Sequence, residues 1–341
     1  MEKIKLTDIC NPKQWKTIPT SELLENGYPV YGANGIIGYY SEFNHKNPVI
    51  TVTCRGATCG TINITVPKSY VTGNAMCLDD MRSDIYMEYL YYCLKHYNFN
   101  NVISGSAQPQ ITRQGMEKIY VTIGSHNEQM DIVDKLKKVE NVIGLRKREL
   151  KQLDTLVKSR FAEMFGDPIR NPKGWKVVTI GDIVTEVRYG TSKPAVEGGK
   201  YPYLRMNNLT ADGHLDLNDL KYIDISDDEV EKCVVRKGDV LFNRTNSIDL
   251  VGKTAVFDLP DDMVIAGYII RVRLNEKILP EVLSQYMNLE ALKDILRSMA
   301  KGAVNQANIN AQELQSIRIY VPDIELQKQF VEMKDQVDKS K

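Results

Sequence analysis

The sequence is poor in cysteine, and its cysteines do not follow a spacing that builds a metal site. Six occur in 341 residues, none of them in a C-x-x-C pair. Cys54 and Cys59 have no cluster of histidines to complete a zinc site. We therefore interpret all six as reduced, half-buried thiols of a cytoplasmic protein, and we expect no metal site.

Long hydrophobic runs are also missing. The longest apolar run, near residues 263–270, is far shorter than the ~20 residues that a membrane-spanning helix needs. The first residues, Met1-Glu2-Lys3-Ile4-Lys5, contain no apolar segment of the kind found in signal peptides. Both absences predict a cytoplasmic protein without a membrane partner.

Charge of one sign does not predominate, because 44 Lys and Arg balance 44 Asp and Glu. This balance argues against a protein that coats nucleic acid by bulk charge, although it leaves room for local basic patches. Catalytic motifs are lacking too. The chain has no P-loop, no Asn/Asp-Pro-Pro-aromatic methyltransferase motif, and no serine or cysteine nucleophile motif beside its four scattered histidines.

What the sequence does contain is a long helical pattern in its middle, from His126 to Phe165. Apart from Gly144, residues 130–165 contain neither glycine nor proline. Apolar residues recur in steps of mostly three and four: Ile132, Leu136, Val139, Ile143, Leu150, Leu153, Val157 and Phe161. This narrow seam predicts a helix of about 40 residues, ~60 Å long, that stands between two domains and pairs with another helix. Gly166-Asp167-Pro168 is expected to end it.

The segments on either side of this helix resemble each other. Both are strand-rich: residues 1–125 contain β-type runs at 28–31 and 48–53, and residues 170–322 contain them at 201–204 and 239–242. One further helix is expected in each half, at 87–97 and at 280–300.

A constant offset of 198 residues relates the ends of the two halves. It aligns Ile111, Met116, Ile119, Val121, Ile123 and Gln129 with Ile309, Leu314, Ile317, Ile319, Val321 and Gln327. Earlier in the halves, Tyr28-Pro29 matches Tyr201-Pro202, and Leu6-x-Asp8-Ile9 matches Ile180-x-Asp182-Ile183. The pattern predicts an internal duplication in which each domain is followed by one helix. The second helix, from about Asp323 to Lys341, has only about 19 residues, and the sequence does not decide whether the natural protein ends there.

Each half has an amide-rich loop just before its last strand. It reads Gly-Ser-Ala-Gln-Pro-Gln-Ile-Thr-Arg at 105–113 and Gly-Ala-Val-Asn-Gln-Ala-Asn-Ile-Asn at 302–310. Amide side chains can pair with the edge of adenine in a major groove. The same composition is typical of capped turns, and both interpretations stay open.

Each half also has a strand that runs into a polar loop. Residues 238–247 read Gly-Asp-Val-Leu-Phe-Asn-Arg-Thr-Asn-Ser, and residues 53–58, Thr-Cys-Arg-Gly-Ala-Thr, take the same place in the first half. Polar side chains that leave a strand end together are well placed to contact bases or phosphates. For Arg55 and Arg244 an ion pair at the strand end is the alternative interpretation.

These residues carry a resemblance to a known family. The segments GDVLFNRTNSIDLVGK at 238–253, YPVYGANGIIGYY at 28–40 and LVKSRFAEMFGDP at 156–168, together with the repeated amide loop, resemble the specificity subunits of type I restriction–modification systems. The resemblance covers nearly the whole chain. It implies an α+β fold: two similar target-recognition domains separated by a long coiled-coil helix, with a shorter helix at the C-terminus. The implied boundaries are 1–125, 126–166, 167–322 and 323–341.

By this resemblance the chain would be a non-catalytic reader of double-stranded DNA. Each domain would bind one half of a split target, and the helical spacer would set the gap. Two adenine-methylating modification subunits would dock on the helices, and restriction subunits would join that assembly. The chain would hold no cofactor of its own, because S-adenosylmethionine, and ATP with Mg²⁺ for restriction, would belong to the partners. The short terminal helix departs from the family, in which it pairs antiparallel with the central helix.

The residues expected to contact DNA lie in the strand-end and amide-rich loops. In the first half they are Arg55, Thr58, Gln108, Gln110, Thr112 and Arg113. In the second half they are Arg205, Asn207, Arg244, Thr245, Asn246, Asn305, Gln306, Asn308 and Asn310.

Two other classes of function remain as alternatives. A coiled-coil scaffold with end domains that bind protein or carbohydrate would show no salt-dependent retention on duplex DNA. A nuclease would use Pro322-Asp323 and Glu332-Met333-Lys334, which superficially follow a Pro-Asp…Glu-x-Lys pattern. We interpret that pattern as coincidence, because Glu332 falls on a predicted helix rather than beside Asp323 on a neighbouring strand.

Overall fold

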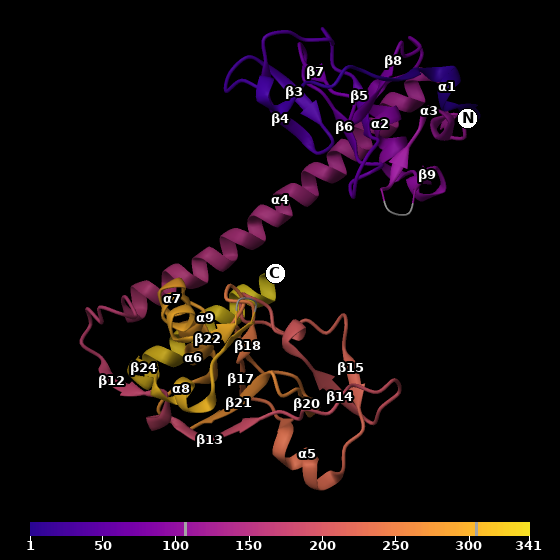
Figure 1. Ribbon diagram of the computed structural model, residues 1–341. Coiled ribbons are helices and arrows are strands. Elements are labelled where there is room, and N and C mark those ends of the chain that lie inside the picture. Colours follow the sequence, from indigo (N-terminus) through magenta and orange to yellow (C-terminus); the bar gives the residue numbers. More distant parts are fainter. Residues whose placement is uncertain (106–107, 304–305) are drawn as a thin grey trace. The chain divides into compact units, whose positions relative to one another are not determined.

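The computed structural model describes residues 1–105, 108–303 and 306–341, with the backbone alone at 301–303 and 306 (Figure 1). The fold is a mixture of helices and strands, as expected. The chain divides into two compact units, Met1–Leu145 and Arg146–Lys341. Among the described residues, no helix combines the length and the apolar character needed to cross a membrane.

The first unit is built on a four-stranded sheet whose strand order is β2 (Asn11–Gln14), β8 (Ala75–Asp79), β5 (Ile50–Thr53), β6 (Ile62–Ile64). A second sheet has the order β4 (Gly35–Tyr40), β3 (Tyr28–Gly32), β7 (Tyr70–Val71). The two-stranded pairs are β1 (Glu2–Lys5) with β11 (Tyr120–Ile123), and β9 (Ile103–Ser104) with β10 (Gln110–Ile111). The helices are α1 (Leu6–Ile9), α2 (Met87–His96) and α3 (Arg113–Met116), with 3₁₀ turns at Thr20–Glu22 and Phe99–Asn101.

The second unit has a four-stranded sheet in the order β13 (Val184–Tyr189), β21 (Ile269–Leu274), β17 (Val240–Asn243), β19 (Thr254–Val256). A second sheet has the order β15 (Lys221–Ile223), β14 (Tyr201–Leu204), β20 (Met263–Ile265), β16 (Val234–Val235). The smaller sheets are β12 (Lys176–Thr179) with β24 (Arg318–Val321), and β18 (Thr245–Asn246) with β23 (Gln306–Asn308) and β22 (Lys301–Ala303). The helices are α5 (Asp227–Cys233), α6 (Pro280–Met287), α7 (Glu290–Met299), α8 (Ala311–Ser316) and α9 (Ile324–Ser340), with 3₁₀ turns at Ile180–Asp182 and Met206–Asn208.

The predicted duplication is present in the strand pairing. In both units the first strand pairs antiparallel with the last: β1 with β11, and β12 with β24. The strands β3 and β14, which begin with the matched Tyr-Pro, each have one antiparallel partner and one parallel partner. The order β2-β8-β5-β6 recurs as β13-β21-β17-β19. The two units are therefore copies of one chain path.

A buried glutamine marks the same joint in each copy. The side chain of Gln129 accepts a hydrogen bond from the backbone N–H of Tyr86 at 2.8 Å and donates to the carbonyls of Asp84 and Gly124 at 2.9 and 3.1 Å. Gln327 does the same in the second unit: it accepts from the N–H of Leu279 at 2.8 Å and donates to the carbonyls of Lys277 and Pro322 at 3.0 and 2.8 Å. Each glutamine ties the start of one helix to the loop ahead of another. This equivalence confirms the offset read from the sequence.

The central helix α4 (His126–Phe165) spans the predicted range. Its seam is covered only near its two ends. Val133 is buried in the core of the first unit, and Val157, Phe161 and Phe165 are buried in the core of the second. In between, the seam residues Leu136, Val139 and Ile143 are 37%, 54% and 49% exposed. Within the described chain, the expected pairing of this seam with another helix therefore occurs over its last part only.

The C-terminal helix α9 covers the last part of α4. The ring of Phe330 lies 5.3 Å from that of Phe161 and 5.5 Å from that of Phe165, edge to face. Further along α9, Lys341 pairs with Asp154 at 2.8 Å. Because residue numbers rise along α9 as they fall along α4, the two helices run antiparallel.

One predicted helix is wrong in its extent. Residues 280–300 form two helices, α6 and α7, rather than one. The break lies at Asn288, whose side chain donates to the carbonyl of Thr254 and accepts from the backbone N–H of Thr254 at 3.2 Å. An amide that bonds the neighbouring strand β19 in this way replaces helical hydrogen bonds, and apolar spacing alone does not reveal it.

Candidate nucleic-acid interface

Arg244 leaves the end of β17 with its backbone fixed from both sides. Its N–H donates to the carbonyl of Tyr268 at 2.9 Å, and its carbonyl accepts from the N–H of Ile309 at 2.9 Å. The guanidinium lies over the ring of Tyr189, 5.0 Å from the ring centroid. Its Nε is buried and has no hydrogen-bond partner among the described residues. A cation held by a ring face keeps donors free for a ligand.

Arg205 occupies the corresponding position after β14. Its Nη2 donates to the carboxylate of Asp219 at 2.7 Å and to the backbone carbonyl of the same residue at 3.2 Å. Its Nε is also buried without a partner in the described part of the chain. Each of the two arginines therefore has a desolvated donor that the protein leaves unpaired, which is uncommon in folded proteins.

Both arginines line one cavity of about 600 Å³. Strands β14 and β20 run parallel, so the residues that follow them meet at one edge of the sheet, and the end of β17 joins them there. The wall includes Lys193, Arg205, Asn207, Arg244 and Tyr268. Tyr268 is 48% exposed and offers a ring face for stacking. Paired guanidinium groups beside an exposed ring fit phosphates, or the acceptor edge of guanine.

Two residues that the sequence did not single out hold this wall in place. Lys253 is buried and donates to the carbonyls of Met206, at 2.9 Å, and Leu209, and burial lowers its pKa. The buried amide of Asn243 donates to the carbonyl of Met206 at 3.4 Å. Both therefore fix the turn that carries Asn207. The segment that includes Lys253 had been noted for its resemblance, but nothing in the sequence showed that this lysine faces inward.

The remaining predicted residues of the second unit hold one another or their own loop. Thr245 is buried and donates to the side-chain oxygen of Asn308 at 3.1 Å. The side-chain oxygen of Asn246 accepts from the N–H of Ser247 at 2.9 Å. Asn310 caps α8 by accepting from two backbone N–H groups. Asn305 and the side chain of Gln306 lie outside the described residues. Contact of this set with DNA stays a prediction.

In the first unit the predicted residues form a smaller surface. Arg55 bridges to Gln110 through the backbone, and both side chains are exposed, as is that of Gln108. Thr58 lies half-buried in the turn after Arg55, where its carbonyl accepts from the N–H of Thr61 at 3.0 Å. These side chains lie at the matched strand end, as the sequence predicted.

The other two residues of the first unit have partners of their own. Thr112 caps α3 by accepting from the N–H of Gly115 at 3.1 Å. Arg113 donates to the side-chain oxygen of Asn11 at 3.1 Å. Of the two interpretations of this loop, the capped turn is the one visible here, and DNA contact by either residue stays a prediction.

Arg55 and Arg244 are not at equivalent positions of the two copies, because the backbone pairing shifts them by one residue. The N–H of Ile111 donates to the carbonyl of Cys54 at 3.0 Å, just as that of Ile309 donates to the carbonyl of Arg244. Arg244 therefore corresponds to Cys54, and Arg55 corresponds to Thr245. Matched backbones therefore present different side chains in the two copies.

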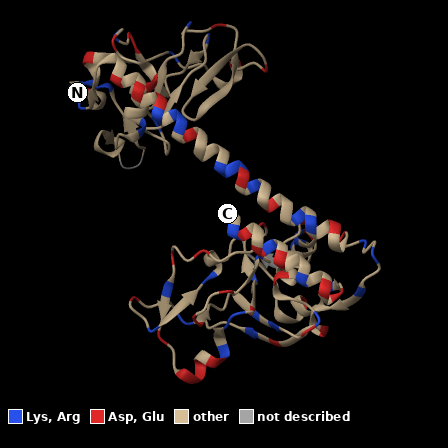
Figure 2. Cartoon of the chain, turned by 180° about the vertical axis from the view of Figure 1, so that it is seen from behind, with Lys and Arg blue, Asp and Glu red and all other residues tan. Residues whose placement is uncertain are grey.

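Charge is interspersed rather than gathered. Basic and acidic residues alternate along α4, and both signs occur over each unit (Figure 2). Acidic residues concentrate on α5, whose first turn holds Asp227, Asp228 and Glu229. An interface in either unit must therefore rest on local groups such as the arginine-lined cavity.

Comparison with known proteins identifies the family. The family model described as the type I restriction modification DNA specificity domain matches residues 1–155 and 172–341. A putative type I restriction enzyme MjaX specificity subunit of Methanocaldococcus jannaschii is 31% identical over 171 residues, 49% of this chain and 40% of that protein. The type I restriction enzyme EcoKI specificity subunit of Escherichia coli is 23% identical over 273 residues, 74% of this chain and 59% of that protein. This chain thus aligns with less than two thirds of the length of either.

Solved structures show the same fold. The crystal structure of a type I restriction–modification S subunit from M. genitalium superposes with a TM-score of 0.60 at 15% identity, over 99% of this chain and 89% of that one. A chain from a structural study of complex assembly in the type I system superposes with a TM-score of 0.56 at 18% identity, over 99% and 90%. With two family matches that cover nearly all of its length, the chain belongs to the family of type I restriction–modification specificity subunits.

Proposed function

We propose that this chain reads a two-part DNA target for a type I restriction–modification complex, one half with each unit. The observation that carries the proposal is the repeated strand end: equivalent backbones present Arg244 in one copy and Cys54 in the other. A scaffold repeated with different side chains at one edge is suited to two different half-sites. The arginine-lined cavity supplies donors in the second unit, and the exposed loop of Arg55 and Gln110 supplies them in the first.

In this proposal α4 is the spacer between the two readers and the docking surface for partners. Its middle part carries apolar side chains that solvent reaches, among them Val139, Val142 and Ile143, which are 54%, 62% and 49% exposed. Exposed apolar stripes of this kind are typical of interaction surfaces. The partners proposed are modification subunits, two in number, with restriction subunits joining through them.

The chain contributes no catalysis in this proposal. S-adenosylmethionine, and ATP with Mg²⁺, would be bound by the partner subunits. This chain would contribute base recognition, and its near-neutral charge is consistent with partners that supply much of the phosphate contact.

The test is to map methylated adenines in the host genome with and without this gene. We expect a motif of two short parts separated by a fixed gap, present only when the gene is intact. Methylation unchanged by loss of the gene would overturn the proposal. If duplex DNA does not retain the chain in a salt-dependent way, with or without modification subunits, a coiled-coil scaffold is favoured instead.

A further inference from the structure

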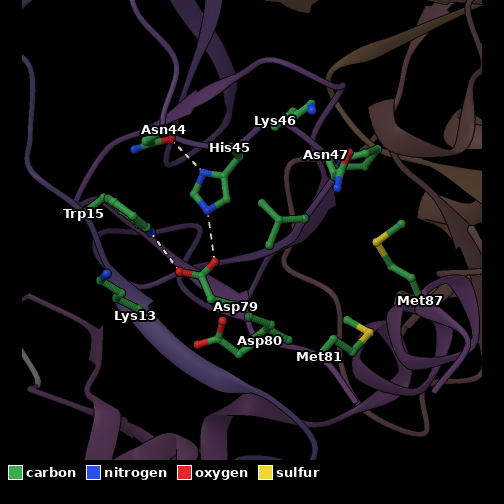
Figure 3. A pocket seen from close by; sticks show the side chains of 13 residues that line it. Lys13, Trp15, Asn44, His45, Lys46, Asn47, Asp79, Asp80, Met81 and Met87 are labelled. Atoms are coloured by element: carbon green, nitrogen blue, oxygen red, sulfur yellow. Dashed lines mark hydrogen bonds and ion pairs between the residues drawn. The ribbon is translucent and has the colours of Figure 1, made fainter. Parts of the chain in front are cut away.

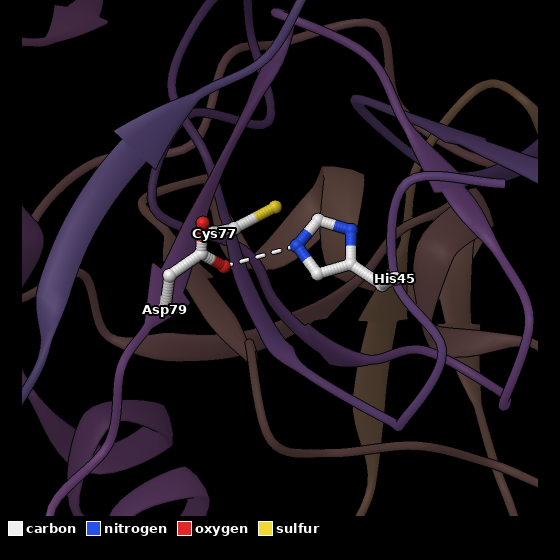
Figure 4. Close-up of side chains that lie close together, drawn as sticks. All are labelled: His45, Cys77 and Asp79. Carbon is white, nitrogen blue, oxygen red and sulfur yellow. Dashed lines mark hydrogen bonds and ion pairs between the residues drawn. The ribbon is translucent and has the colours of Figure 1, made fainter.

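Three potential metal ligands, none of them among the residues proposed to read DNA, converge in the first unit. Cys77 and Asp79 lie two apart on β8 and so project from the same face of the strand. His45 comes from the loop between β4 and β5, and its ring faces both of them (Figure 4). The ligand atoms of the three residues lie within 4.8 Å of one another. Cys77 is fully buried, while the side chains of His45 and Asp79 are 10% and 13% exposed.

The hydrogen bonds of Asn44 fix the tautomer of His45. The Asn44 amide donates to the carbonyl of Val71 at 3.0 Å, and its oxygen accepts from the N–H of Val71 at 2.9 Å, so the orientation of the amide is determined. The same oxygen lies 2.7 Å from His45 Nδ1. Because that oxygen can only accept, Nδ1 carries the proton, and Nε2 of a neutral ring presents a lone pair.

That lone pair points at another acceptor. His45 Nε2 lies 2.9 Å from a carboxylate oxygen of Asp79. Two acceptors this close need either a proton, carried by the ring or by the carboxyl group, or a metal ion that both atoms bind. The thiol of Cys77 beside them supplies a third ligand, which a simple imidazolium–carboxylate pair does not need.

The outer atoms of the ligands are held as they are in metal sites. The second oxygen of Asp79 accepts from the indole N–H of Trp15 at 3.0 Å. His45 Nδ1 donates to Asn44, as described. Ligating histidines usually donate their other nitrogen to an oxygen, and ligating carboxylates are themselves hydrogen-bonded.

In the second unit, arginine side chains pair with the carboxylates at the equivalent place in the fold. The ladder register places Cys77 opposite Thr51 and Arg271 opposite Leu241, which makes Cys77 and Arg271 equivalent positions of the repeat. There, Arg271 is buried and donates to Glu186 at 2.7 Å, and Arg273 donates to Asp239 at 2.9 Å. The second copy therefore pairs arginines with carboxylates, whereas the first copy places a thiol (Cys77) and a histidine (His45) beside the carboxylate of Asp79.

We propose that His45, Cys77 and Asp79 bind one Zn²⁺ ion. Sulfur and imidazole ligands favour zinc over Mg²⁺ or Ca²⁺. On binding, a zinc–sulfur bond replaces the S–H bond of Cys77, and bonds from zinc to His45 Nε2 and to Asp79 replace the proton held between those two residues. Both protons leave to solvent. The thiolate and the carboxylate then balance the two charges of the ion, which suits a site whose thiol packs among Tyr31, Val49 and Val71.

A cavity of about 460 Å³ adjoins two of the three ligands, His45 and Asp79, and leaves room for a fourth ligand on their side (Figure 3). His45 and Asp79 line it together with Trp15, Asn44 and Lys46. Three protein ligands with an open position are the pattern of zinc sites that hold a water or an exogenous ligand. The ion would also fasten the loop that carries His45 to strand β8.

The test is metal binding by the full-length chain after a chelator wash. We expect one zinc per chain by elemental analysis. Cobalt substitution should give a thiolate-to-cobalt charge-transfer band and the intense visible bands of tetrahedral coordination. Because the cobalt spectrum is measured on the unaltered chain, a negative result cannot be explained by a variant that fails to fold. A spectrum showing only the weak bands of the hydrated ion would overturn the proposal and leave His45 and Asp79 as a hydrogen-bonded pair.

Variants assign the ligands. Cys77→Ala and His45→Ala should each weaken zinc affinity, measured by chelator competition, by about 100-fold or more, and Asn44→Ala by about 10- to 100-fold. Cys10→Ala is the matched control, because Cys10 is also a buried thiol of the first unit but lies outside the cluster. Circular dichroism without metal checks that each variant folds. Equal zinc affinity in Cys77→Ala and Cys10→Ala would contradict the assignment.

Discussion

Cys54 and Arg244 stand at one position of the repeat and differ in everything but their backbone. Cys54 is buried, and its sulfur accepts a hydrogen bond from the side-chain amide of Gln14 at 3.0 Å. The guanidinium of Arg244 lies over the ring of Tyr189, and the residue lines the cavity. In the proposed function, target recognition therefore depends on side chains carried at equivalent strand ends rather than on the strands themselves.

Replacing Arg244 by alanine tests the role of that side chain directly. We expect the affinity of the modification complex for its cognate duplex to fall by ~1–3 kcal/mol, the range for one arginine that reads a base. Arg244→Lys should lose part of this, because lysine keeps the charge but not the planar fork. Binding is measured by titration of labelled duplex at fixed salt.

The control for this prediction is Arg297→Ala. Arg297 lies on α7 in the same unit, pairs with Glu290 and Asp294, and does not line the cavity. If both alanine variants bind cognate duplex as the unaltered complex does, Arg244 is not a DNA contact.

The residues around this cavity show which parts of the site could be predicted from the sequence and which could not. Arg205, Asn207 and Arg244 could be proposed because each follows a recognisable strand. Tyr189 and Lys253 could not, because their roles depend on which strands pair. Likewise His45, Cys77 and Asp79 looked like unrelated residues, since only the fold brings a loop histidine beside β8. Side chains joined by long-range topology leave no local signal.

The elements themselves were largely predictable where periodicity was strong. The strands near Tyr28 and Tyr201, helix α2 and the long helix α4 follow from apolar spacing and glycine punctuation. The split of 280–300 did not follow, because it depends on a side-chain bond from Asn288 to a distant strand. Where spacing and a tertiary hydrogen bond compete, the tertiary bond decides.

The buried glutamines provide a stability test for each copy. Gln129→Leu and Gln327→Leu should each destabilise their own unit by about 3 kcal/mol, since each leaves three mostly part-buried backbone groups without partners, at roughly 1 kcal/mol apiece. Urea unfolding gives the free energy, and hydrogen exchange at the start of α2 or α6 locates the change. Gln114→Leu is the control, because that side chain is exposed and makes no hydrogen bond to the described residues. Loss of exchange protection in both units from one substitution would contradict independent joints.

The junction between α9 and the rest of its unit should depend on pH. His214 lies 3.3 Å from Asp212 and 3.5 Å from Asp338 of α9, and hydrogen bonds to these two carboxylates, Asp212 first, raise its pKa to about 9. Lys334 and Lys341 also face Asp338, and Lys341 faces Asp154 as well. A raised histidine pKa means stabilisation that is complete below its ordinary value near 6.5 and is lost as pH rises through about 9.

We expect His214→Gln to destabilise the second unit at pH 6 and to have little effect at pH 10. Because the ring is 38% exposed, solvent screens the pairs, and the effect at pH 6 should be about 1 kcal/mol. The free energy of urea unfolding at the two pH values measures it. His126→Gln on α4 serves as the control histidine. An equal effect of His214→Gln at both pH values would show that the ring acts by packing rather than by charge.

If each copy reads one half-site, as proposed, the helix that joins the two copies sets the spacing between the half-sites. Each residue of an α-helix adds ~1.5 Å, and each base pair ~3.4 Å along the duplex. The exposed part of α4 can be lengthened without touching either core, for example by repeating residues 134–140, Asp-Lys-Leu-Lys-Lys-Val-Glu. Seven residues are nearly two turns, so the apolar face keeps its direction to within about 20°.

With this insertion we expect the gap in the methylated motif to grow by about three base pairs, while the bases of the two half-sites stay the same. The added base pairs also turn one half-site about the duplex axis, so methylation should be slower. Mapping methylated adenines in cells that carry the variant measures both effects. Seven Gly and Ser residues inserted at the same place are the control, because a flexible segment cannot define a new gap. If the helical insertion leaves the gap unchanged, α4 does not act as the spacer, and the separation must be set by the partner subunits.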